Sequence, residues 1–333
     1  MNLTGKITKI LANFYYVQDK DGKIWECFAR ARLLKEGKLL FVGDELEIET
    51  SNPTQGVIVD LQERKNKITK PPVANIDQIL IVFSVCEPDF DFYNLDRYLS
   101  FVQYELPDEK VIVCINKIDL KKINIDNIYK KSNSKVFYIS ALTKEGLNDL
   151  ASELSGKTTV LAGPSGVGKS SIIKALAPDE DIKIGSLSAI KTGKHITRNV
   201  QLILVNCNGK NGFLVDSPGF TQFSFAGLNV QKISGTFPEL NNIGCNFKNC
   251  LHNGEEGCVM ESLLKSKSIC ESRFESYLKI LEEAQSKVIY NTKQESKVKT
   301  NKFLPKIDQL DRQKSRKKAK QELLKSQIES EEN

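Results

Sequence analysis

The chain has 333 residues, of which 40% are hydrophobic and 27% charged, and its formal net charge is +6. This composition is typical of globular proteins and excludes wholesale disorder, and the length is enough for two or three domains with their own cores. No apolar run approaches the roughly 20 residues that cross a bilayer, and residues 1–10 lack the apolar centre of a signal peptide, so we expect a cytoplasmic protein without a membrane partner.

Residues 1–70 consist of short alternating segments separated by turns. Strand-like patterns cover 5–10, 14–17, 24–29, 45–49 and 56–61. Five strands in about seventy residues indicate a small β-barrel, and an OB-type barrel is the obvious candidate. Pro71-Pro72 follows a basic stretch and marks the expected edge of this domain.

From residue 71 to about 226 the pattern changes to strands that alternate with helices. Apolar strand-like runs occur at 79–85, 110–115, 136–139, 158–162, 201–206 and 212–215, with helix-length segments such as 95–104 and 145–154 between them. This alternation predicts a three-layer α/β domain with a largely parallel sheet. Ligands of such sheets bind at the carboxyl ends of the strands.

Two strings at predicted strand ends favour a guanine nucleotide. Asn116-Lys117-Ile118-Asp119 follows the strand at 110–115, and Ser140-Ala141 follows the next strand. A carboxylate at Asp119 can accept from guanine N1–H and the exocyclic amine, for which adenine has no matching donors, while the backbone at the Ser-Ala pair can donate to O6. Alone, the first string is a weak signal, for which a surface turn is the better explanation. In this context it predicts a base-reading loop.

A phosphate-binding loop comes next in the chain. The motif follows the strand at 158–162 and opens a helix, and its residues are Gly163, Pro164, Ser165, Gly166, Val167, Gly168, Lys169 and Ser170. Glycines let backbone N–H groups cradle the phosphates, the lysine ammonium reaches the β and γ oxygens, and the serine hydroxyl reaches Mg²⁺.

Two further polar strings complete the predicted nucleotide site. Asp216, at the end of the strand at 212–215, suits an acidic ligand that holds Mg²⁺ through water, and the Gly219 N–H would meet the γ-phosphate. In the string from Gly193 to Arg198, Thr197 is the candidate that completes the metal shell, although an ordinary loop threonine is an alternative. The base-reading strings precede the phosphate loop, which is the reverse of the usual order and predicts a circularly permuted GTPase.

Phe220 occupies the position where Ras-like switches carry the glutamine that orients the attacking water. Because a phenyl ring cannot do this, the water must be positioned by His195, by a backbone group or by a partner. A packing or partner-binding role for His195 is an equal alternative. We therefore expect slow hydrolysis by the isolated chain and strong stimulation by its partner.

A compact metal site is expected after residue 227. Cys245, Cys250, His252 and Cys258 bring three thiols and one of only two imidazoles into fourteen residues. Three cysteines and one histidine form a closed tetrahedral Zn²⁺ set, so this zinc should be structural. Redox or core cysteines are the alternative for these positions. For the remaining cysteines we expect core packing: Cys27, Cys86, Cys114, Cys207 and Cys270.

The C-terminal part is helical and then polar. A helix is predicted over 261–287, and residues 288–333 form a tail. Residues 291–333 contain twelve basic and seven acidic side chains, an excess of positive charge that is common in nucleic-acid-associated proteins. A solvated tail that only aids solubility is the alternative.

The order of the strings, the barrel before them and the cysteine-histidine cluster behind them resemble one family, the bacterial ribosome small subunit-dependent GTPase A. The resemblance covers roughly residues 1–283 and implies an OB-fold at 1–70, a circularly permuted GTPase domain at 71–226 and a zinc-binding helical domain at 227–287. It carries the GTP contacts over to residues 116–119 and to the segment from Gly163 to Ser171, and the zinc ligands to the cluster above.

By the same resemblance the protein would bind the small ribosomal subunit and its rRNA, and nothing in the sequence demands more than a monomer. It would hydrolyse GTP late in subunit maturation and help other assembly factors leave. The string from Gly193 to Arg198 departs from the family, which commonly has arginine before the histidine and a second threonine after it, and the tail is longer than in the family.

Two other interpretations stay open. In the first, the protein is an RNA-binding assembly scaffold that holds GTP as a structural ligand. In the second, it is an ATP-dependent kinase or ATPase, which Asp119 disfavours.

Overall fold

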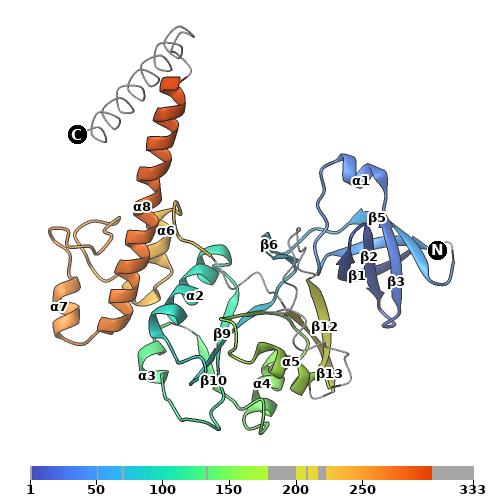
Figure 1. The fold of residues 1–333 in the computed structure, drawn as a ribbon, viewed down its shortest axis with the longest axis horizontal. Helices are drawn as coiled ribbons and strands as arrows, with labels where there is room; N and C mark the ends of the chain where they lie inside the picture. Colours follow the sequence, from blue (N-terminus) through green and yellow to red (C-terminus); the bar gives the residue numbers. More distant parts are fainter. Residues whose placement is uncertain are drawn as a thin grey trace, which may run out of the picture.

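The computed structural model describes residues 2–50, 52–69, 71–132, 134–178, 200–207, 209–216 and 223–301. In chain order these residues form a β-barrel, an α/β domain and a C-terminal helical region (Figure 1). None of the helices in these ranges combines the length and the apolar character that a membrane span needs.

The N-terminal barrel has the five strands that the sequence predicted. They are β1 (Asn2–Leu11), β2 (Phe14–Asp19), β3 (Ile24–Ala29), β4 (Glu45–Thr50) and β5 (Gln55–Leu61). β1 pairs with β2 and β4, β2 with β3, β3 with β5, and β5 with β4, so the barrel closes on itself. The short helix α1 (Ala31–Lys35) lies between β3 and β4, as an OB-type barrel requires.

Alternating side chains of these strands fill the barrel. Ile7, Val17, Cys27, Ile48 and Ile58 are fully buried. Burial raises the pKa of the Cys27 thiol to about 11, so this cysteine is a neutral core residue, as expected.

The α/β domain contains a six-stranded sheet in the order β10-β9-β8-β11-β13-β12. The strands are β8 (Gln78–Ser84), β9 (Lys110–Asn116), β10 (Lys135–Tyr138), β11 (Thr158–Ala162), β12 (Gln201–Cys207) and β13 (Lys210–Asp216). Only β12 runs antiparallel to its neighbour, so the expected, largely parallel sheet is confirmed.

Helices cover both faces of this sheet. Ile79 and Ile81 of β8 pack with α2 (Phe92–Glu105) in one apolar core, while Leu80 and Val82 join α4 (Leu147–Leu154) and α5 (Lys169–Leu176) in another. The helix α3 (Asp126–Tyr129) adds to the first core. Because neighbours along β8 point to opposite faces and all are buried, the strand is apolar from Ile79 to Phe83, as expected for a central parallel strand.

Among the described residues, several contacts join the barrel to the α/β domain. Lys9 of β1 pairs with Gln201 of β12, which extends the sheet into the barrel. On the connecting segment, which includes β6 (Lys67–Thr69) and β7 (Pro72–Ala74), Lys65 and Asn66 both bind the Glu109 carboxylate.

The C-terminal region contains α6 (Val230–Gly235), the 3-10 helix η1 (Pro238–Leu240), α7 (Met260–Lys265) and α8 (Glu271–Asn301). The single helix predicted over 261–287 is therefore divided, and its second part is longer than predicted. The break includes Lys267 in the left-handed backbone region, with φ of 56°. Figure 1 shows the end of α8 projecting beyond the rest of the fold.

A buried charge cluster fixes this region on the α/β domain. Arg273 of α8, only 2% exposed, donates to Asp96 of α2 at 2.6 Å and to Glu239 of η1 at 2.7 Å. Tyr129 of α3 also donates to Asp96, at 2.9 Å. Since a buried guanidinium needs such partners, these contacts set how α8 lies on α2.

Candidate functional site

Four of the five predicted nucleotide strings have residues at one edge of the sheet. Asn116 ends β9, Ser140 follows β10, Gly163 follows β11 and Asp216 ends β13. These strands are parallel, so their carboxyl ends lie together. Asp216 pairs through its backbone with Leu161 and Gln201.

Asn116 connects three of the four strings. Its side chain, 2% exposed, donates from Nδ2 to the Val167 carbonyl at 2.9 Å and accepts the Ala141 N–H on Oδ1 at 3.0 Å. The Asn116 carbonyl also accepts from the Val85 N–H of the β8 loop. One buried amide therefore holds the phosphate loop and the Ser-Ala loop in register with the base-reading loop.

The base-reading loop is a tight turn beside the Ser-Ala loop. Lys117 lies in the left-handed region with φ of 65°, and the Ile118 N–H donates to the Ile139 carbonyl at 3.2 Å. Asp119 is exposed. Its carboxylate is thus accessible to a base that enters from solvent.

Glycines of the phosphate loop allow close backbone contacts. A Cβ at Gly163 would lie 2.1 Å from the Val82 carbonyl oxygen, and one at Gly168 would lie 2.2 Å from Asn116 Nδ2. The Lys169 ammonium contacts the loop carbonyls of Gly163 and Pro164 at 2.8 and 2.6 Å. Ser170 and Ser171 follow in the first turn of α5, as the motif requires.

One part of this edge was not predicted from the sequence. The loop after β8 lies between the base-reading and phosphate loops, where the Lys117 ammonium donates to the Glu87 carbonyl and Pro88 lies 3.4 Å from the position of a Cβ on Gly166. Ser84 fixes this loop by donating to the Pro88 carbonyl at 2.9 Å. No local motif marks it, and only the central place of β8 in the sheet could have indicated it.

Four predicted residues lie outside the described ranges: His195, Thr197, Gly219 and Phe220. Their predicted roles stay predictions.

The predicted metal ligands come together in the C-terminal region. Ligand atoms of Cys245, Cys250, His252 and Cys258 all lie within 4.8 Å of one another. The Cys245 sulfur lies 3.8 Å from that of Cys258, and His252 Nδ1 lies 3.5 and 3.7 Å from these two sulfurs. The imidazole also hydrogen-bonds the Leu240 backbone.

These separations fit a tetrahedral zinc ion. Zn–S bonds of about 2.3 Å and Zn–N bonds of about 2.0 Å place sulfurs roughly 3.8 Å apart and sulfur and nitrogen roughly 3.5 Å apart. Burial, together with the neighbouring Cys258 and Cys245 thiols, raises the pKa of the Cys250 thiol to about 12, and burial lowers the pKa of His252. A divalent cation would offset the rise in the pKa of Cys250, because it stabilises thiolates.

Glu255 orders the ligand loop around this cluster. Its carboxylate accepts the Leu251 N–H at 2.9 Å and the Asn253 N–H at 2.7 Å, on either side of His252. His252 itself has φ of 57°, which a turn stabilised from both sides can impose. The separations between the ligand atoms and the ordering of the loop by Glu255 both support a structural role for the proposed zinc.

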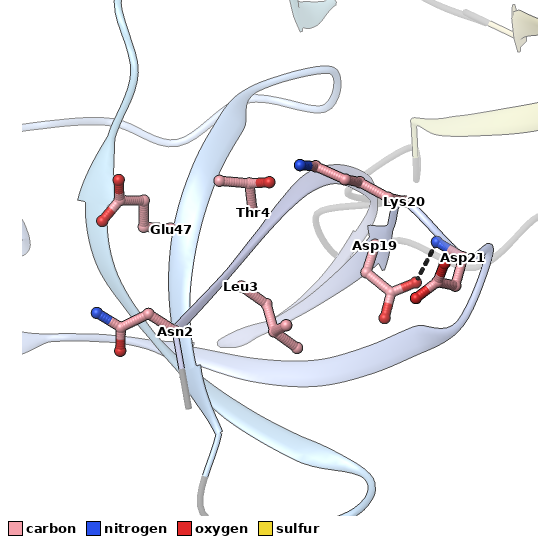
Figure 2. A pocket seen from close by; sticks show the side chains of 7 residues that line it. All are labelled: Asn2, Leu3, Thr4, Asp19, Lys20, Asp21 and Glu47. Atoms are coloured by element: carbon pink, nitrogen blue, oxygen red, sulfur yellow. Dashed lines mark hydrogen bonds between the residues drawn. The ribbon is translucent and has the colours of Figure 1, made fainter.

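A hollow among the described residues lies elsewhere, on the barrel. It measures about 420 Å³ and is lined by Asn2, Leu3, Thr4, Asp19, Lys20, Asp21 and Glu47 (Figure 2). The Asp19 carboxylate already accepts from Asp21 N–H, Lys23 N–H and Trp25 Nε1, so it stabilises its own turn. We assign no ligand to this hollow.

Comparisons with known proteins agree with this geometry. The profile of the RsgA GTPase family matches residues 61–226, and that of the RsgA N-terminal domain matches residues 4–58. The small ribosomal subunit biogenesis GTPase RsgA 1 of Listeria monocytogenes serotype 4b is 36% identical over 296 residues, which cover 86% of this chain and 98% of the relative. The RsgA of Bacillus cereus is 36% identical over 293 residues, with 85% and 98% covered.

Solved structures give the same result. The crystal structure of YjeQ from Thermotoga maritima superposes with a TM-score of 0.72 at 28% identity, over 85% of this chain and 98% of YjeQ. YloQ, described as a circularly permuted GTPase, superposes with a TM-score of 0.70 at 28% identity, over 86% and 96%. The predicted fold class is thereby confirmed, and the chain belongs to the RsgA GTPase family.

Proposed function

We propose that this GTPase binds the small ribosomal subunit and hydrolyses GTP to time late subunit maturation and the release of assembly factors. The observation that carries the proposal is the Asn116 side chain, which joins a guanine-reading loop to a phosphate loop at 2.9 Å. The names of the relatives, small ribosomal subunit biogenesis GTPases, supply the partner.

Each element of the site has a proposed part in binding GTP. Asp119 accepts from guanine N1–H and the amine, and the Ala141 region donates to O6. Lys169 leaves the loop carbonyls for the β and γ oxygens. Ser170, Asp216 and Thr197 are proposed ligands of Mg²⁺, which when bound neutralises charge on the phosphates.

We propose that the attacking water is positioned with help from the ribosomal partner, because Phe220 cannot orient it. GTP hydrolysis with and without purified small subunits tests this. Small subunits should raise kcat at least tenfold. Equal turnover in both samples would contradict the proposal.

Lys169→Ala separates a timing enzyme from a scaffold with structural GTP. The variant should lose turnover and fail to support growth where the chromosomal copy is depleted, because the ammonium stabilises the transferred phosphoryl group. Lys174→Ala, on the same helix, is the matched control. Full complementation by Lys169→Ala would favour the scaffold.

We further propose one structural Zn²⁺ per monomer, held by Cys245, Cys250, His252 and Cys258. The proposed domains are residues 1–70, 71–226 and 227–287, followed by a basic tail at 288–333.

A further inference from the structure

The loop after β8, residues 85–90, lies between the two loops that are proposed to hold the nucleotide. In the sheet, β8 is flanked by β9 and β11, and these strands lead into the base-reading loop and the phosphate loop. Ser84 at the end of β8 pairs with Asn116 of β9, and Ile81 pairs with Ala162 of β11. The loop after β8 therefore leaves the sheet between the origins of both nucleotide loops.

Two consecutive residues of this loop contact the two nucleotide loops. The Glu87 carbonyl accepts a hydrogen bond from the Lys117 ammonium in the base-reading loop. On the other side, Pro88 Cδ lies 3.4 Å from the position of a Cβ on Gly166 in the phosphate loop. Because Glu87 and Pro88 are adjacent in the chain, a displacement of this dipeptide would change the distance between the base-reading loop and the phosphate loop.

Ser84 determines the conformation of the loop. Its side chain, only 1% exposed, donates from Oγ to the Pro88 carbonyl at 2.9 Å and so closes a turn over residues 84–88. The Val85 N–H donates to the Asn116 carbonyl at 3.1 Å, which ties the start of the loop to β9. Since the hydroxyl is buried, water competes little for this hydrogen bond.

Aromatic packing anchors the other end of the loop. The Phe90 ring lies 5.9 Å from the ring of Phe83 in β8 and 4.8 Å from that of Phe92 in α2, edge-on in both pairs. Such pairs add to the stabilisation that burial provides. The loop is thus anchored at both ends, and the turn that Ser84 closes determines the conformation between these anchors.

The distance between the two nucleotide loops matters for a ligand that binds both at once. GDP and GTP carry the base at one end and the phosphates at the other. When the two loops are held at the matching distance, the second contact forms without a further cost of ordering. A ligand that binds only one loop gains nothing from this arrangement.

We propose that Ser84 is a positioning residue for the guanine nucleotide. Through the loop after β8 it holds the base-reading loop and the phosphate loop at the distance that a single nucleotide spans. This role rests on the proposed nucleotide site at residues 116–119 and 163–171. Ser84 acts through Glu87 and Pro88 and does not touch the ligand itself, so its loss weakens only those ligands that span both loops.

Ser84→Ala removes the hydroxyl, and two ligands distinguish the consequences. GDP spans both loops, whereas inorganic pyrophosphate can occupy the phosphate loop alone. The Kd of fluorescent GDP should rise by about tenfold or more, because a buried hydrogen bond that fixes the loop is lost. The inhibition constant of pyrophosphate, measured by competition with the same GDP, should stay within about twofold of the wild-type value.

Ser100→Ala is the matched control. Ser100 of α2 is also 1% exposed, and its Oγ lies 2.6 Å from Thr236 Oγ1, away from the nucleotide edge. This variant loses a buried hydrogen bond as well, so its Tm should fall. Its affinities for GDP and for pyrophosphate should nevertheless equal those of the wild type.

Two outcomes would overturn the proposal for Ser84. Unchanged GDP affinity in Ser84→Ala would show that the loop keeps its position without the hydroxyl. Equal losses of GDP and pyrophosphate affinity would show that Ser84 only supports the phosphate loop or the fold. If Ser84→Ala does not fold, Pro88→Ala, which changes an exposed residue of the same loop, should show the selective loss of GDP affinity, and its absence would likewise overturn the proposal.

The wild type separates this proposal from the proposed nucleotide site. A wild-type protein without affinity for GDP would overturn that site, and the role of Ser84 with it. A wild type that binds GDP, together with Ser84→Ala that binds it equally well, would overturn the role of Ser84 alone. Both measurements are made without ribosomal subunits, so they do not depend on the proposed partner.

Discussion

At the scale of single residues, Asn116 has the largest consequence for the nucleotide site. Its amide is almost completely buried and is bonded to two other loops. Removal of such a group leaves a buried N–H and a buried carbonyl without partners, each at a cost of about 1–3 kcal/mol. The structure thus gives this residue a bracing role in addition to its proposed place next to the base.

Asn116→Ala should lower the affinity for fluorescent GDP by about thirtyfold or more, equivalent to about 2 kcal/mol. Asn148→Ala, an exposed asparagine on α4, is the matched control and should bind as the wild type. Equilibrium titration measures both. An affinity within threefold of the wild type would mean that the loops hold their register without the amide.

Glu153 is the second residue with a clear individual role. Lys110 and Lys135 begin β9 and β10, and Lys157 directly precedes β11, so all three stand opposite the proposed nucleotide edge. The Glu153 carboxylate contacts their ammonium groups at 2.6, 3.3 and 2.8 Å. Burial acts to raise its pKa, but the three lysines outweigh this and lower the pKa to about 2.

A depressed carboxylate pKa stabilises the folded state above the unfolded-state pKa, here near the ordinary 4.5, and this contribution is lost as the pH falls towards 2. Glu153→Gln should therefore reduce the free energy of unfolding by about 2 kcal/mol at pH 7. The difference in the free energy of unfolding between this variant and the wild type should shrink as the pH falls below 4.5. Urea unfolding at several pH values measures it.

Exposed Glu105→Gln is the control for this series and should show no such pH dependence. If the deficit of Glu153→Gln stays constant down to pH 3, the lysine contacts do not govern it.

At the scale of elements, the ligand loop between residues 245 and 258 has little apolar content of its own. Its order depends on turns at Gly254 and Gly257, on Glu255 and on the four clustered side chains. The adjoining apolar core is shared with α6, α7 and α8. Loss of the metal should therefore loosen the loop before it unfolds the core.

Purified protein should contain one zinc per chain, and Cys258→Ser should contain less than half of this amount, because a Cys3His site needs all four ligands. Elemental analysis measures the content. Cys270→Ser is the matched control, since Cys270 lies outside the cluster near Ser272. Undiminished zinc in Cys258→Ser would argue against the ligand set, and chelation should lower the Tm of the wild type.

At the scale of the whole molecule, local patterns predicted much of the architecture. The five barrel strands follow from alternation between turns, and the six strands of the sheet follow from apolar runs of the right length. The nucleotide strings were located because phosphate and base recognition require particular residue types next to strand ends. Such information lies within a few neighbouring positions, which is why it can be read from one sequence.

Contacts between distant segments could not be predicted in this way. The Lys9–Gln201 pair, the burial of Arg273 between Asp96 and Glu239, and the ion pair between Arg97 and Glu283 each join residues far apart in the chain. The periodicity of the sequence does not indicate which charged side chains will contact each other in the fold. The same holds for the loop after β8, whose importance comes from the position of β8 in the middle of the sheet.

The strand order also determines when a growing chain can complete its nucleotide site. The barrel and the base-reading strands β9 and β10 are synthesised before the phosphate loop. Thr159 of β11 lies 81 residues after Gln78, its neighbour in β8, and β13 follows later still. Because a chain is synthesised from its amino end, the edge of β8 that pairs with β11 stays unpaired until β11 has been made. Asp216, the proposed Mg²⁺ ligand, ends β13, so the proposed nucleotide site is complete only after all six strands of the sheet have been made.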